Sequence, residues 1–425
     1  MRQLKTLATA LCLASSLLLA AAQAAELPRS KPEAEGMSSE RLRDVTATLM
    51  AGVRDGKIPG AVLMVARHGK VVQFDAVGDL GPVPGAPMPR DAIFRIYSMS
   101  KPVTSVAAMM LVEEGKLKLE DPVSQYIPAF GKVQVGVETP GPNGGTPTLA
   151  LEPARRPMTV QDLLRHTSGL TYGFFGNSLV RTAYDQAKLF EDLDNAAFAD
   201  RLATLPLAAQ PGSTWDYGHS TDILGRVIEV VSGQSLGAFL KARLFEPLGM
   251  NDTSFYVTER SKQGRIAEPF EHDRNLGLNA DIGDPRVARK GESGGGGLMS
   301  TAMDYARFVQ MLRNGGTLDG KRILSPKTVA FMASDHVSPH IKKTGLYLPG
   351  PGYGFGLGFA VRLAPGEGVS PSEPGTYHWG GAAGTLFWVD PKTDLWAVLM
   401  IQSIKQRDHY RSGVMNMVYG SVTAP

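Results

Sequence analysis

The sequence of 425 residues contains one cysteine, Cys12, and no other thiol. Cys12 lies in an N-terminal segment that has the features of a removable leader, so the mature chain is expected to have no cysteine. This excludes disulfides, cysteine nucleophiles and thiolate metal sites. An excess of charge of either sign is also lacking, since 44 Lys and Arg face 41 Asp and Glu without a basic cluster. The charge pattern therefore does not favour a nucleic-acid partner.

A long hydrophobic run is missing as well. Arg2 and Lys5 give the N-terminus a positive charge, residues 7–22 are largely apolar, and Ala22-Gln23-Ala24 is a small-x-small cleavage site. The apolar stretch is short for a membrane-spanning helix of about 20 residues. We expect residues 1–24 to be a signal peptide, with a periplasmic or secreted mature protein that has no stable membrane insertion. An uncleaved anchor is the alternative.

The spacing of apolar residues predicts secondary structure along the rest of the chain. Helices are expected at residues 39–54, 98–114 and 410–419, with a mainly helical region between 160 and 248. Strands are expected where short apolar runs end in turn residues, at 61–66, 71–77, 352–361, 385–389 and 395–401. Two segments rich in Gly, Pro or polar residues are expected to be irregular surface loops, at 136–153 and 251–290.

Ser98-Met99-Ser100-Lys101 opens one of the expected helices. A serine and a lysine three positions apart lie on the same helical face, one turn from each other. In an enclosed site a lysine can accept the proton of a neighbouring serine, which makes the hydroxyl a nucleophile. The tetrapeptide alone is weak evidence, because a solvated helix start gives the same pattern.

Two further motifs follow in order, Tyr217-Gly218-His219 and Trp379-Gly380-Gly381. With Ser98-x-x-Lys101 they resemble the penicillin-recognising serine hydrolases, which include class C β-lactamases and D-alanyl peptidases. The chain is most similar to the family VIII carboxylesterases of that superfamily. The resemblance covers essentially the whole mature chain, because segments 164–170, 247–250, 296–301 and 352–356 also match.

The resemblance implies a fold and an activity. The implied fold is α+β, with an antiparallel sheet flanked by the N- and C-terminal helices and an inserted, mainly helical region. The expected division is an α/β domain at residues 25–97 and 291–425 and a helical domain at 98–290, with the active site between them. The oligomeric state is left open.

The same resemblance implies roles for individual residues. Ser98 would be the nucleophile, Lys101 its base, and Tyr217 the residue that passes a proton to the leaving group. The backbone N–H groups of Ser98 and Ala382 would form an oxyanion hole. No cofactor and no metal are expected.

The third motif departs from the pattern of β-lactamases and peptidases. These enzymes usually carry Lys-Thr-Gly where this chain has Trp379-Gly380-Gly381, and the lysine binds a substrate carboxylate. The neutral indole favours uncharged esters, and the two glycines allow the backbone to approach substrate closely. Trp379 could instead be a core residue. His219, where β-lactamases have asparagine, could contact substrate or be a hydrogen-bonded structural residue.

Three functions remain open at this stage. The preferred one is a carboxylesterase acting on small or short-acyl esters, and a β-lactamase, D-alanyl peptidase or other amide hydrolase of the same fold is the second. A non-catalytic binder of cell-wall fragments is the third, disfavoured by the presence of all three reactive residues. Ser293 stands in a literal Gly-x-Ser-x-Gly motif, but the strand and helix that such a nucleophile requires are not predicted around it.

Overall fold

The computed structural model describes residues 26–277, 283–344 and 346–424. The expected signal peptide, residues 1–24, lies outside the described residues, so its prediction is not tested. In the described part of the chain no single helix is long and apolar enough to cross a membrane. One bent pair, Ser220–Ser232 with Leu236–Leu248, meets the length and composition criteria together.

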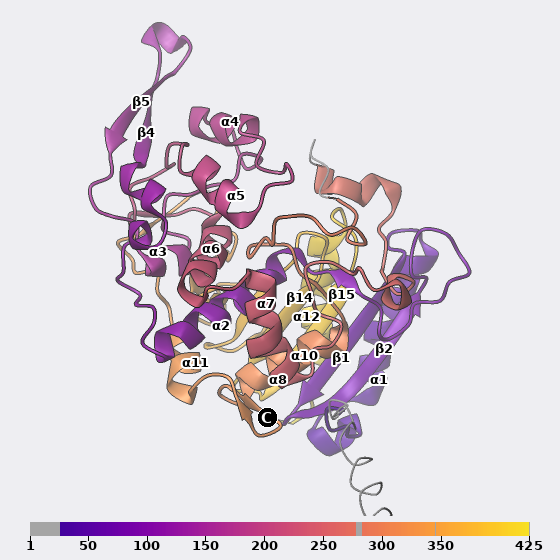
Figure 1. Cartoon of the computed structure of the whole chain (residues 1–425). Coiled ribbons are helices and arrows are strands. Elements are labelled where there is room, and N and C mark those ends of the chain that lie inside the picture. The colour runs from indigo at the N-terminus through magenta and orange to yellow at the C-terminus, as the bar shows by residue number, and fades with distance from the viewer. Residues whose placement is uncertain (1–25, 278–282, 345, 425) are drawn as a thin grey trace, which may run out of the picture.

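A seven-stranded sheet has the strand order β11-β12-β13-β14-β15-β1-β2. Figure 1 labels β14, β15, β1 and β2 of this sheet. All neighbouring pairs in it are antiparallel, which confirms the expected sheet. Its strands are β1 (Gly60–Arg67), β2 (Lys70–Gly78), β11 (Tyr353–Phe355), β12 (Ala360–Arg362), β13 (Tyr377–Gly380), β14 (Leu386–Asp390) and β15 (Leu395–Ile401).

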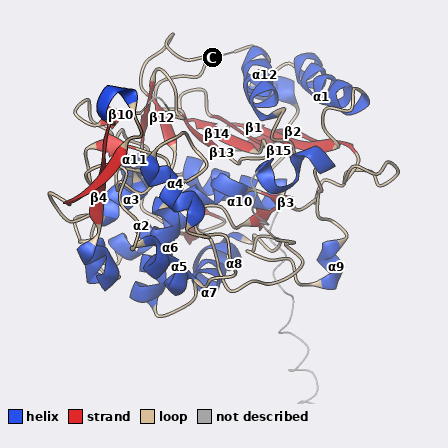
Figure 2. Cartoon of the chain, turned by 90° about the horizontal axis from the view of Figure 1, so that it is seen from above, coloured by secondary structure: helices blue, strands red, loops and turns tan. Residues whose placement is uncertain are grey.

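Helices cover both faces of the sheet. Successive side chains of a strand point to opposite sides, so both faces present apolar side chains that need covering. All eight residues of β1 are buried. Ala61, Leu63 and Val65 pack in one apolar cluster with residues of α1 (Ser39–Arg54) and α12 (Arg407–Gly420). The alternate residues Val62 and Met64 belong to the larger cluster on the other face. Figure 2 shows α1 and α12 on one side of the sheet and the remaining labelled helices on the other.

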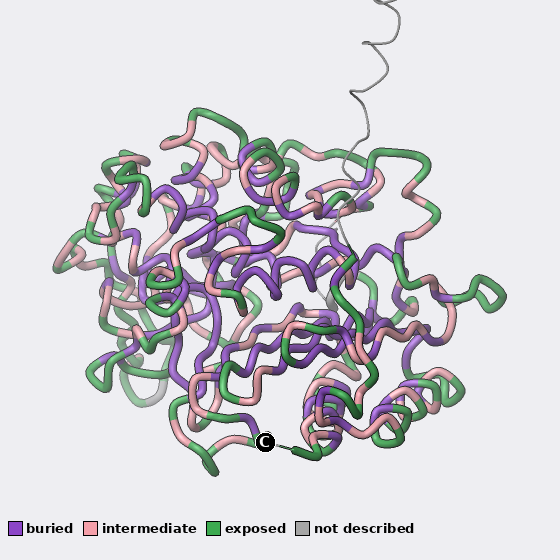
Figure 3. The backbone as a smooth tube through the Cα atoms, turned by 90° about the horizontal axis from the view of Figure 1, so that it is seen from below, coloured by how far each residue is buried: buried purple, intermediate pink, exposed green. Residues whose placement is uncertain are grey.

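The second face carries the rest of the helices. α2 (Ser100–Glu113) is apolar around most of its circumference and nearly all of it is buried, as expected for a helix at the centre of a large core. Figure 3 shows the buried positions concentrated in the sheet and in the helices next to it. The other helices are α3 (Val160–Leu164), α4 (Leu179–Gln186), α5 (Asn195–Leu202), α6 (Ser220–Ser232), α7 (Leu236–Leu240), α8 (Glu246–Leu248), α9 (Arg260–Gln263), α10 (Ala302–Arg313) and α11 (Pro326–Met332).

Small strand pairs connect the layers. Phe94–Arg95 (β3) pairs with Met299–Ser300 (β7), and this ladder fixes the segment that leads into Ser98. The remaining short strands are β4 (Gln134–Thr139), β5 (Thr148–Pro153), β6 (Thr214–Trp215), β8 (Thr317–Leu318), β9 (Lys321–Arg322) and β10 (Lys342–Lys343).

Two expectations from the sequence were wrong. Residues 136–153 are not an irregular loop: β4 and β5 form an antiparallel hairpin, which projects from the body of the molecule in Figure 1. Residues 352–361 are not one strand, because β11 and β12 pair with each other in a tight reversal. Gly358 in that reversal has φ 106, a conformation that glycine adopts without strain. The assignment of residues 98–290 to a separate helical domain stays a prediction.

Candidate active site

Ser98 lies in a 3₁₀ turn, Tyr97–Met99, immediately before α2. The preceding residue, Tyr97, has φ 44, which is unusual for a bulky side chain. Such strain persists only where the surrounding structure holds it. Two hydrogen bonds hold the backbone of this turn: the Ile96 N–H donates to Leu298 O at 3.1 Å, and the Tyr305 hydroxyl donates to Met99 O at 2.9 Å. The turn therefore holds Ser98 at the start of the helix, partly exposed to a cavity.

Lys101 is fully buried, one turn after Ser98. Its Nζ lies 3.2 Å from Ser98 Oγ, which confirms the expected proximity of the two side chains. The same nitrogen lies 3.2 Å from the Tyr172 hydroxyl and 2.7 Å from Gly295 O. These three acceptors match the three N–H bonds of an ammonium group. Burial, with the charges of Asp222 and Tyr217, raises the pKa of Tyr172 well above its usual value, so this phenol stays protonated.

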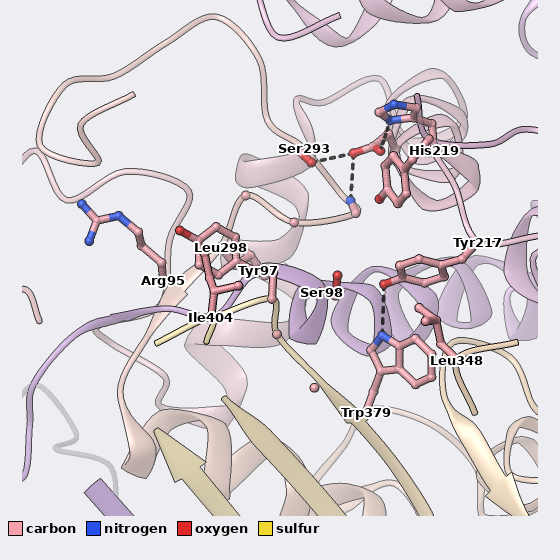
Figure 4. Close-up of a pocket in the computed structure, with 18 of the residues that line it drawn as sticks. Arg95, Tyr97, Ser98, Tyr217, His219, Ser293, Leu298, Leu348, Trp379 and Ile404 are labelled. Carbon is pink, nitrogen blue, oxygen red and sulfur yellow. Dashed lines mark hydrogen bonds and ion pairs between the residues drawn. The ribbon is translucent and has the colours of Figure 1, made fainter. Parts of the chain in front are cut away.

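Tyr217 contacts Lys101 through its ring rather than its hydroxyl. The Lys101 Nζ lies 4.5 Å from the ring centroid, a cation–π distance. The Tyr217 hydroxyl points toward Ser98 in Figure 4 and accepts a hydrogen bond from Trp379 Nε1 at 3.2 Å. The structure thus brings Ser98, Lys101, Tyr217 and Trp379 together. It also gives Trp379 a polar partner, which neither sequence-based interpretation of this residue, as a substrate contact or as a core residue, included.

His219 is buried and belongs to a second polar group. Its Nδ1 lies 3.0 Å from Asp222 Oδ2, while Asp222 Oδ1 accepts from Ser293 Oγ at 2.5 Å and from the Gly295 N–H at 3.0 Å (Figure 4). Burial opposes ionisation of Asp222, but hydrogen bonds and positive charge, from His219 first and then from Lys101, outweigh it and lower its pKa. Asp222 therefore holds the loop whose Gly295 carbonyl contacts Lys101.

The same contacts bear on Ser293, the serine of the Gly-x-Ser-x-Gly motif. Its hydroxyl donates to Asp222, and within the described residues it contacts no histidine or lysine that could remove its proton. It lies in a turn that precedes Met299–Ser300, without the strand before it and the helix after it that define a nucleophile elbow.

Gly380, Gly381 and Ala382 lie where β13 turns toward β14. A Cβ on Gly381 would lie 2.2 Å from Ile96 O, so only glycine allows this turn to pack against the segment before Ser98. Ala382 lines the same cavity as Ser98, and its N–H has no acceptor among the described residues. The structure does not test whether these two amides bind an oxyanion.

A cavity of about 1000 Å³ opens above Ser98. One side is apolar and comes from the segments before and after α4 and from α5, with Phe174, Phe175, Leu189, Phe190 and Phe198. The other side is formed by β13 and α12. Such a cleft, mainly apolar with a few polar groups, is typical of small-molecule sites. In the described part of the chain no group of three or more His, Cys, Asp or Glu residues is arranged to hold a metal ion.

Several residues of this site were not predicted from the sequence. Tyr172 and Gly295 contact Lys101 from segments 71 and 194 positions away, and no local spacing indicates such contacts. Asp222 had a usable signal, because it follows His219 by three positions at the start of α6 and so shares its face. Arg411 of α12 lines the cavity and contacts Gly381 O, and no pattern in the sequence indicated it.

Comparison with known proteins agrees with this architecture. The Beta-lactamase family model matches residues 42–413. The chain is 40% identical over 355 residues to Protein Rv1367c of Mycobacterium tuberculosis, covering 82% of this chain and 86% of that protein. It is 32% identical over 373 residues to Esterase EstB of Burkholderia gladioli, covering 82% and 87%.

Among solved structures, it is similar to EstCE1, described as a hydrolase with promiscuous acyltransferase activity. The TM-score is 0.74 at 29% identity, and the match covers 89% of this chain and 98% of that one. These matches bear out the resemblance seen in the sequence. The chain belongs to the beta-lactamase family, as a beta-lactamase-fold hydrolase with esterase and acyltransferase relatives.

Proposed function

We propose that this protein is a serine carboxylesterase that cleaves small, uncharged esters through an acyl-enzyme on Ser98. The observation that carries the proposal is the 3.2 Å contact between Lys101 Nζ and Ser98 Oγ, made inside a cavity large enough for a small ester. A buried lysine at this distance can take the serine proton once it has lost its own. The similarity to Esterase EstB supports the same reaction class.

In the acylation step, Ser98 Oγ attacks the ester carbonyl carbon and its proton passes to the neutral Lys101 amine. The carbonyl π bond becomes an oxyanion, which the N–H groups of Ser98 and Ala382 would stabilise. Collapse of this tetrahedral intermediate breaks the bond to the alkoxide. Tyr217 protonates the alkoxide, and the resulting phenolate is stabilised by the Trp379 N–H and by the nearby Lys101 ammonium, which returns the proton.

Deacylation repeats these steps with water in place of the serine. Water adds to the acyl carbonyl, loses its proton to the same basic groups and expels Ser98 Oγ, which is reprotonated. An alcohol bound in the cavity would give acyl transfer to a new ester by the same route. The similarity to EstCE1 makes this branch worth measuring, and the product ratio in the presence of a short-chain alcohol reports it.

The preference for uncharged esters rests on Trp379. At this position of β13 it presents a buried indole, 5% exposed, instead of a cation that could bind a substrate carboxylate. The aromatic side of the cavity would take up an apolar acyl group. A β-lactamase or D-alanyl peptidase stays the second candidate, because nucleophile, base and fold are shared between these enzymes.

The decisive experiment compares wild type with Ser98→Ala and with Ser293→Ala, the matched variant of the rival serine. A short-acyl nitrophenyl ester and a chromogenic cephalosporin are the substrates, and a fluorophosphonate adduct located by mass spectrometry identifies the nucleophile. We expect rapid ester cleavage, loss of it only in Ser98→Ala, and the adduct on Ser98. Faster cephalosporin cleavage would replace the esterase by an amide hydrolase. An adduct on another residue would refute the mechanism.

Export is part of the same proposal. The N-terminal pattern of residues 1–24 supports cleavage after Ala24, which would release the enzyme into the periplasm or the medium. N-terminal sequencing of the protein from fractionated cells tests this. A protein that retains residue 1 and stays in the cytoplasmic fraction would contradict it.

A further inference from the structure

Arg411 of the C-terminal helix α12 reaches the turn between β13 and β14. Its Nη2 donates to Gly381 O and, at 3.0 Å, to Thr385 O. The guanidinium lies flat against the strand end, since a Cβ on Gly380 would come within 2.6 Å of Arg411 Cζ. The two glycines of Trp379-Gly380-Gly381 therefore have separate uses: Gly380 admits the arginine, and Gly381 admits the backbone of Ile96.

The carbonyl of Gly381 and the N–H of Ala382 belong to one peptide group. In a planar trans peptide the two bonds point in opposite directions, so a cation held at the oxygen faces away from the N–H. Hydrogen bonds in a chain polarise one another, and a charged donor at the oxygen makes the N–H at the other end a stronger donor. Ala382 lines the cavity beside Ser98, and its N–H has no acceptor among the described residues.

No carboxylate of the described residues forms an ion pair with this cation, although the charge of Asp408 acts on it without direct contact. Within the described residues, no acidic side chain lies within ion-pair distance of Arg411, and its Nε is buried without an acceptor. Burial, with the charge of Arg407, lowers the pKa of Arg411 to about 10, so the guanidinium stays positive at neutral pH. Buried charges without a counterion are costly, and a neutral side chain could fill the same space. The charge is therefore directed at the peptide oxygens of this turn.

We propose that Arg411 is a positioning residue that holds and polarises the Gly381–Ala382 peptide, so that the Ala382 N–H stabilises the oxyanion formed on attack by Ser98. This inference rests on the proposed function, because it requires a tetrahedral intermediate at Ser98. It assigns to α12, which packs on the sheet face opposite α2 and also lines the cavity, an effect on the reacting carbonyl oxygen through the Ala382 N–H.

The test is Arg411→Met, with Arg411→Lys as the conservative variant and Arg43→Met as the matched control, because Arg43 lies on α1 in the same layer and does not line the cavity. Removing a whole oxyanion donor lowers kcat by about 10²–10³-fold, so loss of its polarisation should lower kcat by roughly 10–100-fold. KM for the nitrophenyl ester should change by less than about threefold, because the effect belongs to the transition state. Arg411→Lys should recover part of the loss, and Arg43→Met should retain activity.

A second readout separates this role from a merely structural one. A trifluoromethyl ketone forms a tetrahedral adduct on a serine nucleophile, whereas the matching methyl ketone binds mainly as an uncharged ground-state analogue. Arg411→Met should lose affinity for the fluorinated ketone in proportion to kcat and keep its affinity for the methyl ketone. Equal losses for both ketones, or an unchanged kcat, would overturn the inference.

Fluorophosphonate labelling separates failure of this inference from failure of the proposed function. If Ser98 of the wild type is not labelled, the proposed function itself fails. If Ser98 is labelled in both proteins and Arg411→Met keeps its kcat, only the role of Arg411 fails. Should Arg411→Met not fold, Arg411→Lys carries the test, because it keeps the charge but lacks the planar guanidinium that lies against Gly380 and holds Nη2 at the two carbonyls. An Arg411→Lys variant with full kcat and full ketone affinity would then overturn the inference.

Discussion

The hydrogen bond from Trp379 to Tyr217 is the contact whose loss can be assessed most directly. Trp379→Phe removes the indole N–H, which lies 3.2 Å from the Tyr217 hydroxyl, and keeps an aromatic ring in place. The ring contacts to be kept are those with Tyr217, at 5.5 Å between centroids, and with Phe355, at 5.3 Å. The substitution therefore tests one donor rather than the whole side chain.

The expected loss of kcat depends on the charge of the acceptor, the hydroxyl oxygen of Tyr217. A hydrogen bond to a charged group contributes roughly 1.5–3 kcal/mol, whereas a bond between neutral groups contributes about 0.5–1.5 kcal/mol. If Tyr217 carries negative charge in the transition state, the bond is stronger there than in the ground state by about 1–1.5 kcal/mol, so kcat should fall by roughly 5–12-fold, at about 1.4 kcal/mol per factor of ten. KM should stay nearly constant, because the added strength of this bond belongs to the transition state.

The assay is steady-state hydrolysis of a nitrophenyl ester, with unfolding followed by calorimetry. Trp396→Phe is the matched control, because it also removes a buried indole bond, from Nε1 to Gln310 Oε1 at 2.7 Å, but on β15 away from Ser98. Both variants should lose some stability, and only Trp379→Phe should lose kcat. A large rise in KM alone would show that Trp379 contacts substrate. If kcat stayed within twofold of wild type, the proton-transfer role of this bond would be refuted.

Three further perturbations test the surroundings of the site. Arg181→Met leaves Asp216 buried without its bidentate partner and should cost about 3–5 kcal/mol at pH 7 by calorimetry. Burial already raises the pKa of Asp216, so keeping it ionised costs stability as pH rises. The stability difference between Arg181→Met and wild type should therefore shrink toward pH 4, and a difference that does not change with pH would contradict this. Gly381→Ala, which would press Cβ against Ile96 O, should abolish ester turnover in a folded protein, and full turnover would disprove the packing argument. Asp222→Asn removes a carboxylate whose pKa is lowered despite burial, so the wild type should lose stability below about pH 4 and the variant should lose less. Parallel curves of Tm against pH for the two proteins would contradict this.

The central sheet and the Ser98–Lys101 pair could be predicted because both depend on local patterns. A spacing of three residues places two side chains on one helical face, and short apolar runs with turns between them indicate strands. The hairpin of β4 and β5 was missed for the opposite reason. Apolar residues do alternate in both strands, at Val135 and Val137 and at Leu149 and Leu151, but each run is short, most of its side chains are exposed, and the surrounding Gly and Pro residues favoured a loop.

Contacts between distant segments could not be predicted from the sequence. Tyr172 reaches Lys101 across 71 positions, and Arg411 reaches Gly381 across 30 positions from another layer of the fold. Gly358 shows the same limit for backbone structure, since glycine inside an apolar run is compatible with a continuous strand as well as with a reversal. The pairing of β11 with β12 in the folded sheet decides between them.

The indole at Trp379 also bears on why an ester would be preferred to an amide. A neutral N–H stabilises a phenolate less than an ammonium does, so a lysine at position 379 would stabilise the Tyr217 phenolate more strongly than Trp379 does, in addition to Lys101 against its ring. An alkoxide can leave with little help from a proton, whereas an amine must be protonated as its bond to carbon breaks. The weaker stabilisation of the Tyr217 phenolate is therefore sufficient for ester cleavage and slows the cleavage of amides. We expect Trp379→Lys to raise the ratio of cephalosporin to ester turnover. An unchanged ratio in a folded variant would mean that substrate preference is set elsewhere in the cavity.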